Sequence, residues 1–282
     1  AAEDAAPPAR RLGRALGVRP PLLGTPPHPV WRIETPELKV ELWPLGDLTH
    51  QEDILRRDFT CNALSWELPD GPLVDLVEGL SDIEDRRLRA VSRSNLEDDP
   101  VRLLRGPRFL AQLADFELDD GTRRWIEKLA PSLAGAPRER VGHELLTLLR
   151  TPAASRGLEE CLDLGLFLPA GPKSCTVDTP WLLTHLNAAD RLIVHSVESK
   201  TSELECGAGV SPAIGRSGRT HDAARLALLF RAWGLPSERD TAPYAWPRPV
   251  RENALRAAAM LDEALATVDA APADRRELAW RA

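Results

Sequence analysis

Hydrophobic and polar residues alternate in the first quarter of this chain as they do in β-strands. Residues 30–33 and 38–43 alternate β-branched or aromatic residues with polar ones on either side of a short turn, which predicts a β-hairpin. Residues 62–68 and 73–75 flank a turn rich in proline and glycine and predict a second hairpin. With a short helix expected over residues 9–16, this part of the chain predicts part of a mixed sheet.

After residue 79 the apolar period becomes helical. Over residues 99–115 apolar residues recur near helical spacing, and two aspartates stand at the N-terminal end, where carboxylates suit caps and the helix dipole. Further helices are expected over residues 121–134, 138–150, 153–164, 180–197, 221–233 and 249–268, with a Gly- and Ser-rich loop over residues 199–218.

This order of elements predicts an α+β fold in which a partial head sheet precedes an all-α neck and body. We place the head at residues 1–80, the neck at residues 81–170 and the body at residues 171–282. The chain starts at Ala1 and its single methionine is Met260, so we expect further sequence upstream.

The composition is that of an ordinary soluble globular protein, with 43% hydrophobic and 28% charged residues. No apolar run approaches the ~18 residues that a membrane span needs, so no membrane partner is predicted. Cys61, Cys161, Cys175 and Cys206 lack CxxC spacing, which indicates neither a zinc site nor a disulfide framework. A reducing cytoplasm is therefore the expected location. The sequence does not predict an oligomeric state.

The formal net charge of −7 argues against broad, non-specific coating of nucleic acid. It leaves room for a local basic groove, because the distribution of charge rather than its total sets the field. Arginines cluster at positions 56–57, 86–89, 102–108 and 138–140. For the cluster at 86–89 a solvated face is the favoured interpretation.

Asp99 and Arg102 are three positions apart, on one face of the expected helix. A carboxylate only accepts hydrogen bonds and a guanidinium only donates them, so the pair fits a ligand edge with a donor beside an acceptor. Cytosine and adenine present such an edge, whereas uracil and guanine present the reverse. A mismatched edge leaves polar groups unpaired, so the pair would accept C and A and reject U and G. From spacing alone, a surface ion pair is the commoner arrangement.

Arg105 and Arg108 continue this row at the same three-residue step. Such a stripe suits a triphosphate, because guanidinium groups form paired, charge-assisted bonds to phosphate oxygens. The alternative is that both pair with acidic side chains of the neck. Upstream, the Arg-Arg-Asp triplet at 56–58 precedes Asn62, and the Asp58 carboxylate could accept hydrogen bonds from ribose hydroxyls. The alternative for this triplet is a solvated turn.

Together these motifs resemble the class II nucleotidyltransferases, the family of tRNA CCA-adding enzymes and bacterial poly(A) polymerases. The triplet with Asn62 resembles the family's RRDxxxN motif, and residues 98–102 resemble its EDxxR motif, with Asp98 in place of the usual Glu. Residues 75–83 resemble the hinge between head and neck, and residues 137–141 resemble a later neck motif with a structural role. The resemblance implies a polymerase-beta-like nucleotidyltransferase head and nucleotide contacts from Arg57, Asp58, Asn62, Asp99, Arg102, Arg105 and Arg108.

The activity that this resemblance implies is template-independent addition of C, A or both to RNA 3′ ends, above all those of tRNA. ATP and CTP would be the substrates and Mg²⁺ the cofactor. The family's first motif, a Gly-Gly turn followed by a DxD strand that binds two magnesium ions, does not occur in these 282 residues. Glu41 is a candidate for a third metal-binding carboxylate, although any strand glutamate would match as well. We therefore do not expect these residues alone to form a complete catalyst.

The connection over residues 42–55 is short for a loop that must reshape a pocket for the final adenine, which favours CC addition. The alternatives are a poly(A) polymerase and a non-catalytic RNA- or nucleotide-binding remnant. A third is an HD-type phosphohydrolase, which residues 181–192 and 223–233 faintly resemble. Residues 228–231 are apolar and basic where that class needs a His-Asp pair, and His221-Asp222 suits a helix cap, so we disfavour a hydrolase.

Overall fold

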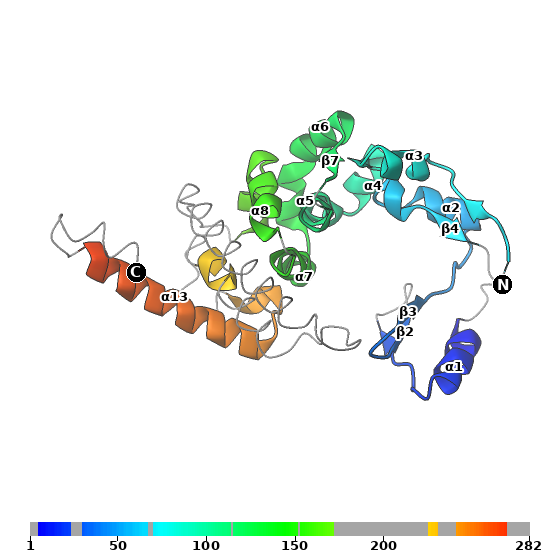
Figure 1. Ribbon diagram of the computed structural model, residues 1–282, viewed down its shortest axis with the longest axis horizontal. Coiled ribbons are helices and arrows are strands. Elements are labelled where there is room, and N and C mark those ends of the chain that lie inside the picture. The colour runs from blue at the N-terminus through cyan, green and yellow to red at the C-terminus, as the bar shows by residue number, and fades with distance from the viewer. Residues whose placement is uncertain are drawn as a thin grey trace, which may run out of the picture. The chain divides into compact units, whose positions relative to one another are not determined.

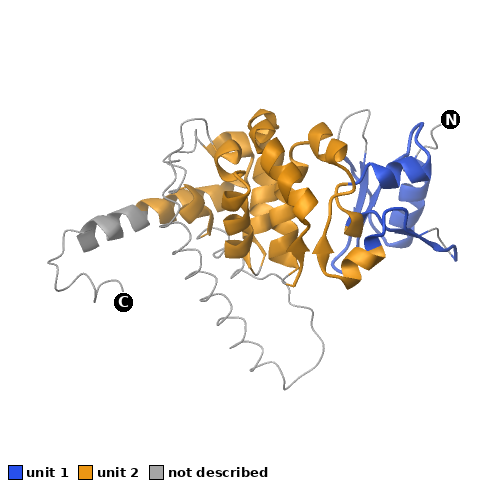
Figure 2. Cartoon of the chain, turned by 90° about the horizontal axis from the view of Figure 1, so that it is seen from above, with its two compact units in different colours: residues 1–57, 62–79 blue, residues 58–61, 80–282 orange. Residues whose placement is uncertain are grey.

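The computed structural model divides the chain into two compact units (Figure 2). Unit 1 comprises Ala1–Arg57 and Asn62–Gly79, and unit 2 comprises Asp58–Cys61 and Leu80–Ala282. The structure describes residues 5–23, 30–66, 70–113, 115–151, 153–171, 225–230 and 241–269. The helix expected over 180–197, the loop over 199–218 and most of the helix over 221–233 lie outside the described residues.

Unit 1 is built around a small antiparallel sheet. Its strands pair in the order β1-β2-β3, and Arg32 lies opposite Glu41 in the β2–β3 register. This confirms the first predicted hairpin. The second is confirmed but shorter, because the chain forms a 3₁₀ turn at η1 before the strand begins. The elements are α1 Ala6–Ala15, β1 Leu22–Leu23, β2 Val30–Glu34, β3 Lys39–Leu42, α2 His50–Leu55, η1 Thr60–Asn62, β4 Ser65–Trp66 and β5 Leu73–Val74.

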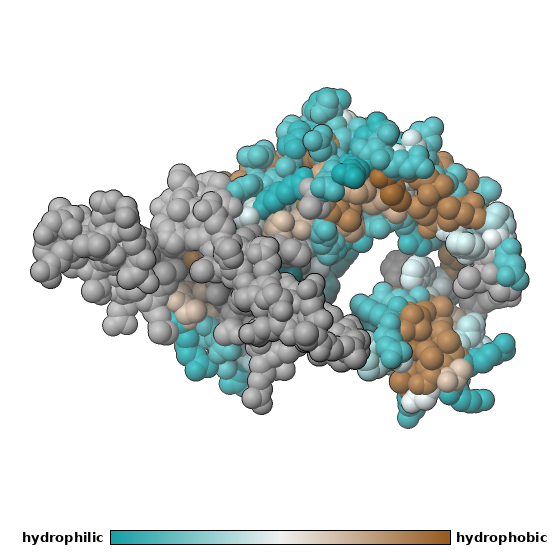
Figure 3. Space-filling view, viewed as in Figure 1, coloured by the Kyte–Doolittle hydropathy of each residue, from teal (hydrophilic) through white to brown (hydrophobic). Residues whose placement is uncertain are grey.

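The described part of unit 1 has a small core and exposes several large apolar side chains. Ile33 and Ile54 are buried in it, whereas Trp66 is 63% exposed. Figure 3 shows hydrophobic side chains at the surface of this unit. Helix α2 begins with a capping box, in which Thr49 accepts from the backbone of Glu52 and the Glu52 side chain accepts from the backbone of Thr49. The start of α2 is therefore fixed by its own sequence.

Unit 2 is mainly helical (Figure 1). The helices expected over 121–134, 138–150, 153–164 and 249–268 are confirmed as α6 with η2, α7, α8 and α13. A parallel pair, β6 with β7, was not predicted, because two-residue strands are too short to show alternation. The elements are α3 Gly79–Glu84, β6 Arg87–Leu88, α4 Arg93–Asp98, α5 Arg102–Gln112, β7 Glu117–Leu118, α6 Asp120–Leu129, η2 Ala130–Gly135, α7 Arg138–Leu149, α8 Ala154–Asp163, α9 Phe167–Ala170, η3 Ala242–Tyr244 and α13 Arg248–Asp269.

The helix expected over residues 99–115 is confirmed as α5, Arg102–Gln112, but its expected start is wrong. Helix α4 ends at Asp98, and α5 begins only at Arg102. Asp99 is extended, with φ −139° and ψ 90°, because the residue before a proline is disfavoured in the helical region and Pro100 follows it. The two aspartates therefore do not cap a helix; they lie at the bend between two helices.

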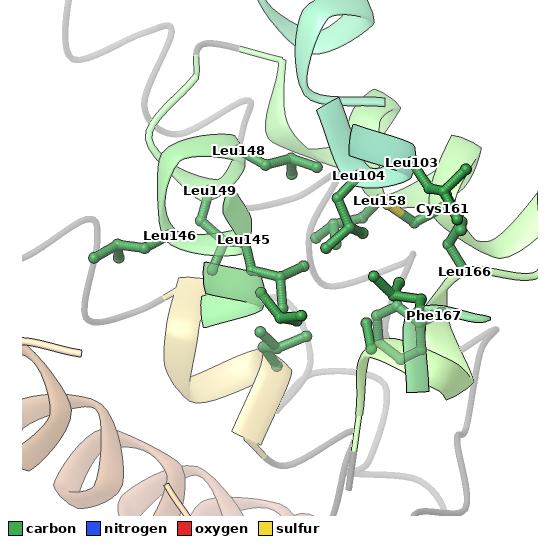
Figure 4. Close-up of a cluster of buried hydrophobic side chains, with 14 of the residues drawn as sticks. Leu103, Leu104, Leu145, Leu146, Leu148, Leu149, Leu158, Cys161, Leu166 and Phe167 are labelled. Atoms are coloured by element: carbon green, nitrogen blue, oxygen red, sulfur yellow. The ribbon is translucent and has the colours of Figure 1, made fainter. Parts of the chain in front are cut away.

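The core of unit 2 is formed by leucine side chains that α5, α7 and α8 turn toward one another (Figure 4). Leu104 of α5, Leu145 of α7 and Leu158 of α8 are at most 1% exposed. Helices α5 and α8 approach closely because Gly157 has no side chain: a Cβ there would lie 2.9 Å from the Cβ of Ala111. This packing holds α5 and α7 against each other.

Residues Asp58–Cys61 belong to unit 2, where Phe59 forms an isolated antiparallel bridge with Ala90 before η1 begins at Thr60. Thr60 N donates to Arg89 O at 2.9 Å, and Val91 N donates to Asp58 O at 2.9 Å. Phe59 is fully buried there. The buried Asp82 carboxylate accepts a hydrogen bond from Thr60 Oγ1 at 2.7 Å. The aspartate of the Arg-Arg-Asp motif is thus anchored in the helical unit. In the part of the chain that the structure describes, no helix has the length and apolar character to cross a bilayer.

Candidate nucleotide-binding site

Asp99 and Arg102 meet across the bend between α4 and α5. Asp99 O accepts a hydrogen bond from Arg102 N at 2.9 Å, which closes the turn leading into α5. Arg102 Nε lies 3.7 Å from Asp99 Oδ2, and Arg102 Nη1 donates to the carbonyl of Asn95 at 3.0 Å. The side chains of Asp99 and Arg102 are 23% and 25% exposed. The structure therefore brings the predicted pair together, through a bend and not through helical spacing.

Arg140, near the start of α7, binds the Asp99 carboxylate with both of its terminal nitrogens. Nη1 donates to Oδ1 at 3.0 Å and Nη2 donates to Oδ2 at 2.6 Å. An ionised carboxylate has about four lone-pair sites, so this fork leaves Asp99 with capacity for another donor.

Asp58 is 3% exposed and interacts with Arg105 of α5. Asp58 Oδ1 accepts from Phe59 N at 2.8 Å, and Oδ2 lies 2.8 Å from Arg105 Nη1. The second contact is an ion pair whose alignment is too poor for a hydrogen bond, so among the described residues Oδ2 has no hydrogen-bond donor. A buried oxygen in that state suits a hydroxyl donor.

Arg105 and Arg108 both lie over the ring of Phe109, at 5.6 Å and 4.3 Å from its centre. Arg108 Nε also lies 2.8 Å from Glu144 Oε2 of α7. Burial lowers the pKa of Arg108, and the Glu144 carboxylate opposes that effect. Arg108 therefore pairs with an acidic side chain of the neck, as the alternative interpretation expected, whereas the partner of Arg105 is Asp58, outside the predicted neck. A phosphate would compete with these carboxylates for them.

The other predicted contacts lie in unit 1. Arg57 Nη2 donates to Asp53 Oδ2 at 2.7 Å, and both residues line a pocket of about 240 Å³ that Glu41 also borders. Asn62 is half-buried at the end of η1. The Arg-Arg-Asp motif is thus shared between the units, because Arg57 and Asn62 belong to unit 1 and Asp58 to unit 2.

Glu41 was the candidate metal ligand. Its Oε1 lies 2.7 Å from Arg32 Nη2 and 3.6 Å from Lys39 Nζ. Among the described residues, no three His, Cys, Asp or Glu side chains are placed to hold a metal ion. A carboxylate beside two cations does not by itself fit a two-metal centre. We therefore derive no chemical step through a metal from these residues.

A cavity of about 470 Å³ opens beside α7, within the size range of ligand pockets. Arg140 and Glu144 line it together with Tyr244 and Trp246. The two aromatic rings stack with centroids 4.6 Å apart, and Trp246 Nε1 donates to the carbonyl of Gly142 at 2.7 Å. Arg140 and Glu144, which contact Asp99 and Arg108, thus also line this cavity.

Arg140 and Glu144 were not among the predicted site residues. Their i, i+4 spacing shows that they share a face of α7. Spacing alone does not show that this face meets α5. Arg140 is 41 positions from Asp99, so the contact depends on tertiary packing.

Two parts of the chain match known protein families. Residues 32–89 match the Poly A polymerase head domain, and residues 115–173 match the probable RNA and SrmB-binding site of polymerase A.

Several relatives are similar over part of their length. A CC-adding tRNA nucleotidyltransferase of a Synechocystis species is 41% identical over 108 residues, which cover 38% of this chain and 26% of that protein. A CCA-adding enzyme of Streptococcus sanguinis is 41% identical over 123 residues, which cover 42% and 30% of the two chains. An A-adding tRNA nucleotidyltransferase of Deinococcus radiodurans is 38% identical over 142 residues, which cover 48% and 32%. The matched segments thus span about a third or less of each relative.

Solved structures share the fold over nearly the whole chain. A tRNA nucleotidyltransferase complexed with a primer tRNA and an incoming ATP analog superposes with a TM-score of 0.67 at 24% identity, covering 96% of this chain and 77% of that one. An apo form of a tRNA-processing enzyme gives a TM-score of 0.68 at 23% identity, covering 96% and 74%. The shared fold shows the architecture alone, and the two domain matches together with the ordered motifs support the family of class II tRNA nucleotidyltransferases and bacterial poly(A) polymerases.

Proposed function

We propose that the protein is a template-independent RNA nucleotidyltransferase that adds C, A or both to RNA 3′ ends. One observation carries the proposal: Asp99 Oδ2 and Arg102 Nε lie 3.7 Å apart, with about a quarter of each side chain exposed. An acceptor beside a donor matches the amino group and the neighbouring ring nitrogen of cytosine and adenine. Uracil and guanine present the reverse order, and a mismatched edge is rejected because it leaves polar groups unpaired.

The sugar and phosphates of the same nucleotide have candidate partners on α5 and at Asp58, which pairs with Arg105 of α5. Asp58 Oδ2, buried without a hydrogen-bond donor in the described fold, is the proposed acceptor for a ribose hydroxyl. Arg105 and Arg108 are the proposed phosphate contacts, because guanidinium groups pair with phosphate oxygens. Arg57 and Asn62 belong to unit 1 and stay separate predictions of nucleotide contact.

The RNA is proposed to be tRNA. Residues 115–173, which include α7 and α8, match an RNA-binding region, and the relatives named above act on tRNA by name. A solved structure of the same fold contains a primer tRNA. These observations support residues 81–170 as the part that binds nucleotide and RNA.

We infer CC addition as the product. Seven residues, Trp43 to Thr49, separate β3 from α2, and the capping box at Thr49 fixes the end of that connection. A loop that reshapes a pocket must move while its ends stay fixed, so a short one suits a single pocket shape. The relatives do not separate the products, because CC-, CCA- and A-adding proteins match at 41%, 41% and 38% identity.

Mg²⁺ is the proposed cofactor of the intact protein, with Glu41 as one possible ligand and the remaining ligands outside the described residues. A divalent ion would supply the activation of the attacking 3′-hydroxyl and the neutralisation of the leaving pyrophosphate. We place the protein in the cytoplasm, which the free thiols of Cys61 and Cys161 support.

Two other functions are alternatives to tRNA nucleotide addition. One is a non-catalytic nucleotide- or RNA-binding protein. A poly(A) polymerase is favoured by the two family matches, both of which are named for that enzyme.

One incubation separates these functions. The intact protein is mixed with tRNA that lacks its 3′-terminal CCA, with CTP, ATP and Mg²⁺, and the products are sized at single-nucleotide resolution. We expect extension by two cytidines. A further adenosine would show that the inference from the short connection is wrong, and a long A tract would indicate a poly(A) polymerase. Nucleotide binding without extension would indicate the non-catalytic protein.

A further inference from the structure

We propose that Arg140 is a positioning residue for base selection and that it acts through Asp99. The inference rests on the proposed function, because Asp99 is there the acceptor for the amino group of the incoming base. It assigns to Arg140 a role beyond the structural one that the sequence motif implies.

The Asp99 side chain needs an external partner to hold it. Its backbone is fixed by the bend before α5, where its carbonyl accepts from Arg102 N at 2.9 Å. Its carboxylate is 23% exposed and does not lie on a helix. Arg102 Nε is 3.7 Å away, which is too far for a hydrogen bond. In the described structure the side-chain hydrogen bonds to this carboxylate come from Arg140.

Arg140 can fix the plane of the carboxylate. Its two nitrogens donate to the two oxygens at 3.0 Å and 2.6 Å, and such a planar fork sets both the position and the rotation of its partner. The remaining lone pairs of the two oxygens stay available to a base amino group. Base selection depends on that orientation, because a rotated carboxylate no longer lies beside the Arg102 donor.

The backbone of Arg140 is held in place by the start of α7. Its backbone N donates to Pro137 O at 3.0 Å, and the next residue, Val141, is fully buried against the core. One turn later Glu144 pairs with Arg108 at 2.8 Å. The same face of α7 thus contacts both the proposed base reader and a proposed phosphate contact, at the edge of the 470 Å³ cavity.

The test compares nucleotide selectivity in four variants of the intact protein. Arg140→Ala removes the fork, and Arg140→Lys keeps the charge but replaces the fork with a single ammonium group. Arg138→Ala is the matched control on the same helix, because Arg138 Nη1 donates to the carbonyls of Pro169 and Ala170 at 3.1 Å and 2.8 Å. Asp99→Ala reports on the base reader itself. The readout is the ratio of kcat/KM for CTP over UTP and for ATP over GTP, with Tm for each variant.

We expect Arg140→Ala to lower both ratios by about tenfold or more, as for other directed base contacts. Arg140→Lys should lower them less, and Arg138→Ala should lower Tm while leaving the ratios within about twofold. Loss of selectivity in Asp99→Ala with unchanged selectivity in Arg140→Ala would overturn this inference alone. Unchanged selectivity in both would overturn the base-reading pair, and this inference with it.

Discussion

Asp58 and Arg105 form a largely buried ion pair across 47 positions of the chain, with Arg105 Nη1 2.8 Å from Asp58 Oδ2. The contact joins the Arg-Arg-Asp motif to the arginine row of α5. Because Asp58 is 3% exposed, its charge is compensated mainly inside the fold. Arg105 is 33% exposed, so its outer edge stays open to a ligand. The Asp58 carboxylate and the Arg105 guanidinium, from two separate sequence motifs, are therefore neighbours in the fold.

A double-mutant cycle should measure this pairing. Asp58→Asn and Arg105→Gln should each lower the free energy of unfolding, because each leaves the other charge without its partner. The double variant should lose less than the sum, with a coupling energy of about 0.5–3 kcal/mol from urea denaturation. Additive losses would show that the ion pair contributes nothing to stability.

Phosphate binding should not depend on the base. Arg105→Ala and Arg108→Ala should each raise KM for ATP and for CTP alike, by about tenfold, because a charge-assisted contact to phosphate carries no base information. Arg93→Ala is the control, since Arg93 pairs with Glu97 on the surface of α4. A variant at position 105 or 108 that lost only one of the two nucleotides would contradict the assignment.

The Cys61 thiol should react slowly. Burial, and secondarily the charge of Asp58, raise the pKa of this thiol from 9.0 to about 11. Only the thiolate attacks iodoacetamide, so at pH 8 the folded protein should be alkylated at Cys61 about a hundredfold more slowly than the unfolded protein. The rate should rise as the pH approaches the raised pKa. Mass spectrometry of the Cys61 peptide gives the rate, and equal rates in folded and unfolded protein would refute the shift.

The close approach of α7 to η3 depends on Gly142. A Cβ at this position would collide with the carbonyl oxygen of Tyr244 and lie 2.7 Å from its Cβ. Gly142→Ala should therefore destabilise the protein by about 1–3 kcal/mol. Gly135→Ala is the matched control, because an added Cβ there meets nothing within 4 Å. Equal Tm values for the two variants would show that the contact is not tight.

Sequence patterns predicted the elements whose period is long enough to recognise. The first hairpin and helices α6, α7, α8 and α13 were confirmed, because each repeats its apolar positions over several turns or alternations. The β6–β7 pair was missed because each strand has two residues. The bend at Asp99 was missed because helical spacing was weighed above the proline that follows it.

The site residues were predicted from motifs, and their partners were not. Asp99 with Arg102 is a local pair, and spacing found it. The contacts of Arg140 with Asp99 and of Glu144 with Arg108 join residues 41 and 36 positions apart. Such contacts depend on how α7 packs against α5, which a single sequence does not specify. The predicted nucleotide contacts therefore remain predictions that the structure has placed but not tested.

The central claim is that Asp99 and Arg102 select C and A, and one measurement tests it most directly. The intact protein is offered tRNA lacking its 3′-terminal CCA and each of the four nucleoside triphosphates singly, with Mg²⁺, and kcat/KM is measured for each. The wild type should accept CTP and ATP, or CTP alone if it adds only CC, and reject UTP and GTP. Asp99→Ala and Arg102→Ala should each lose about 1–3 kcal/mol of that discrimination. Unchanged selectivity in both variants would contradict the account.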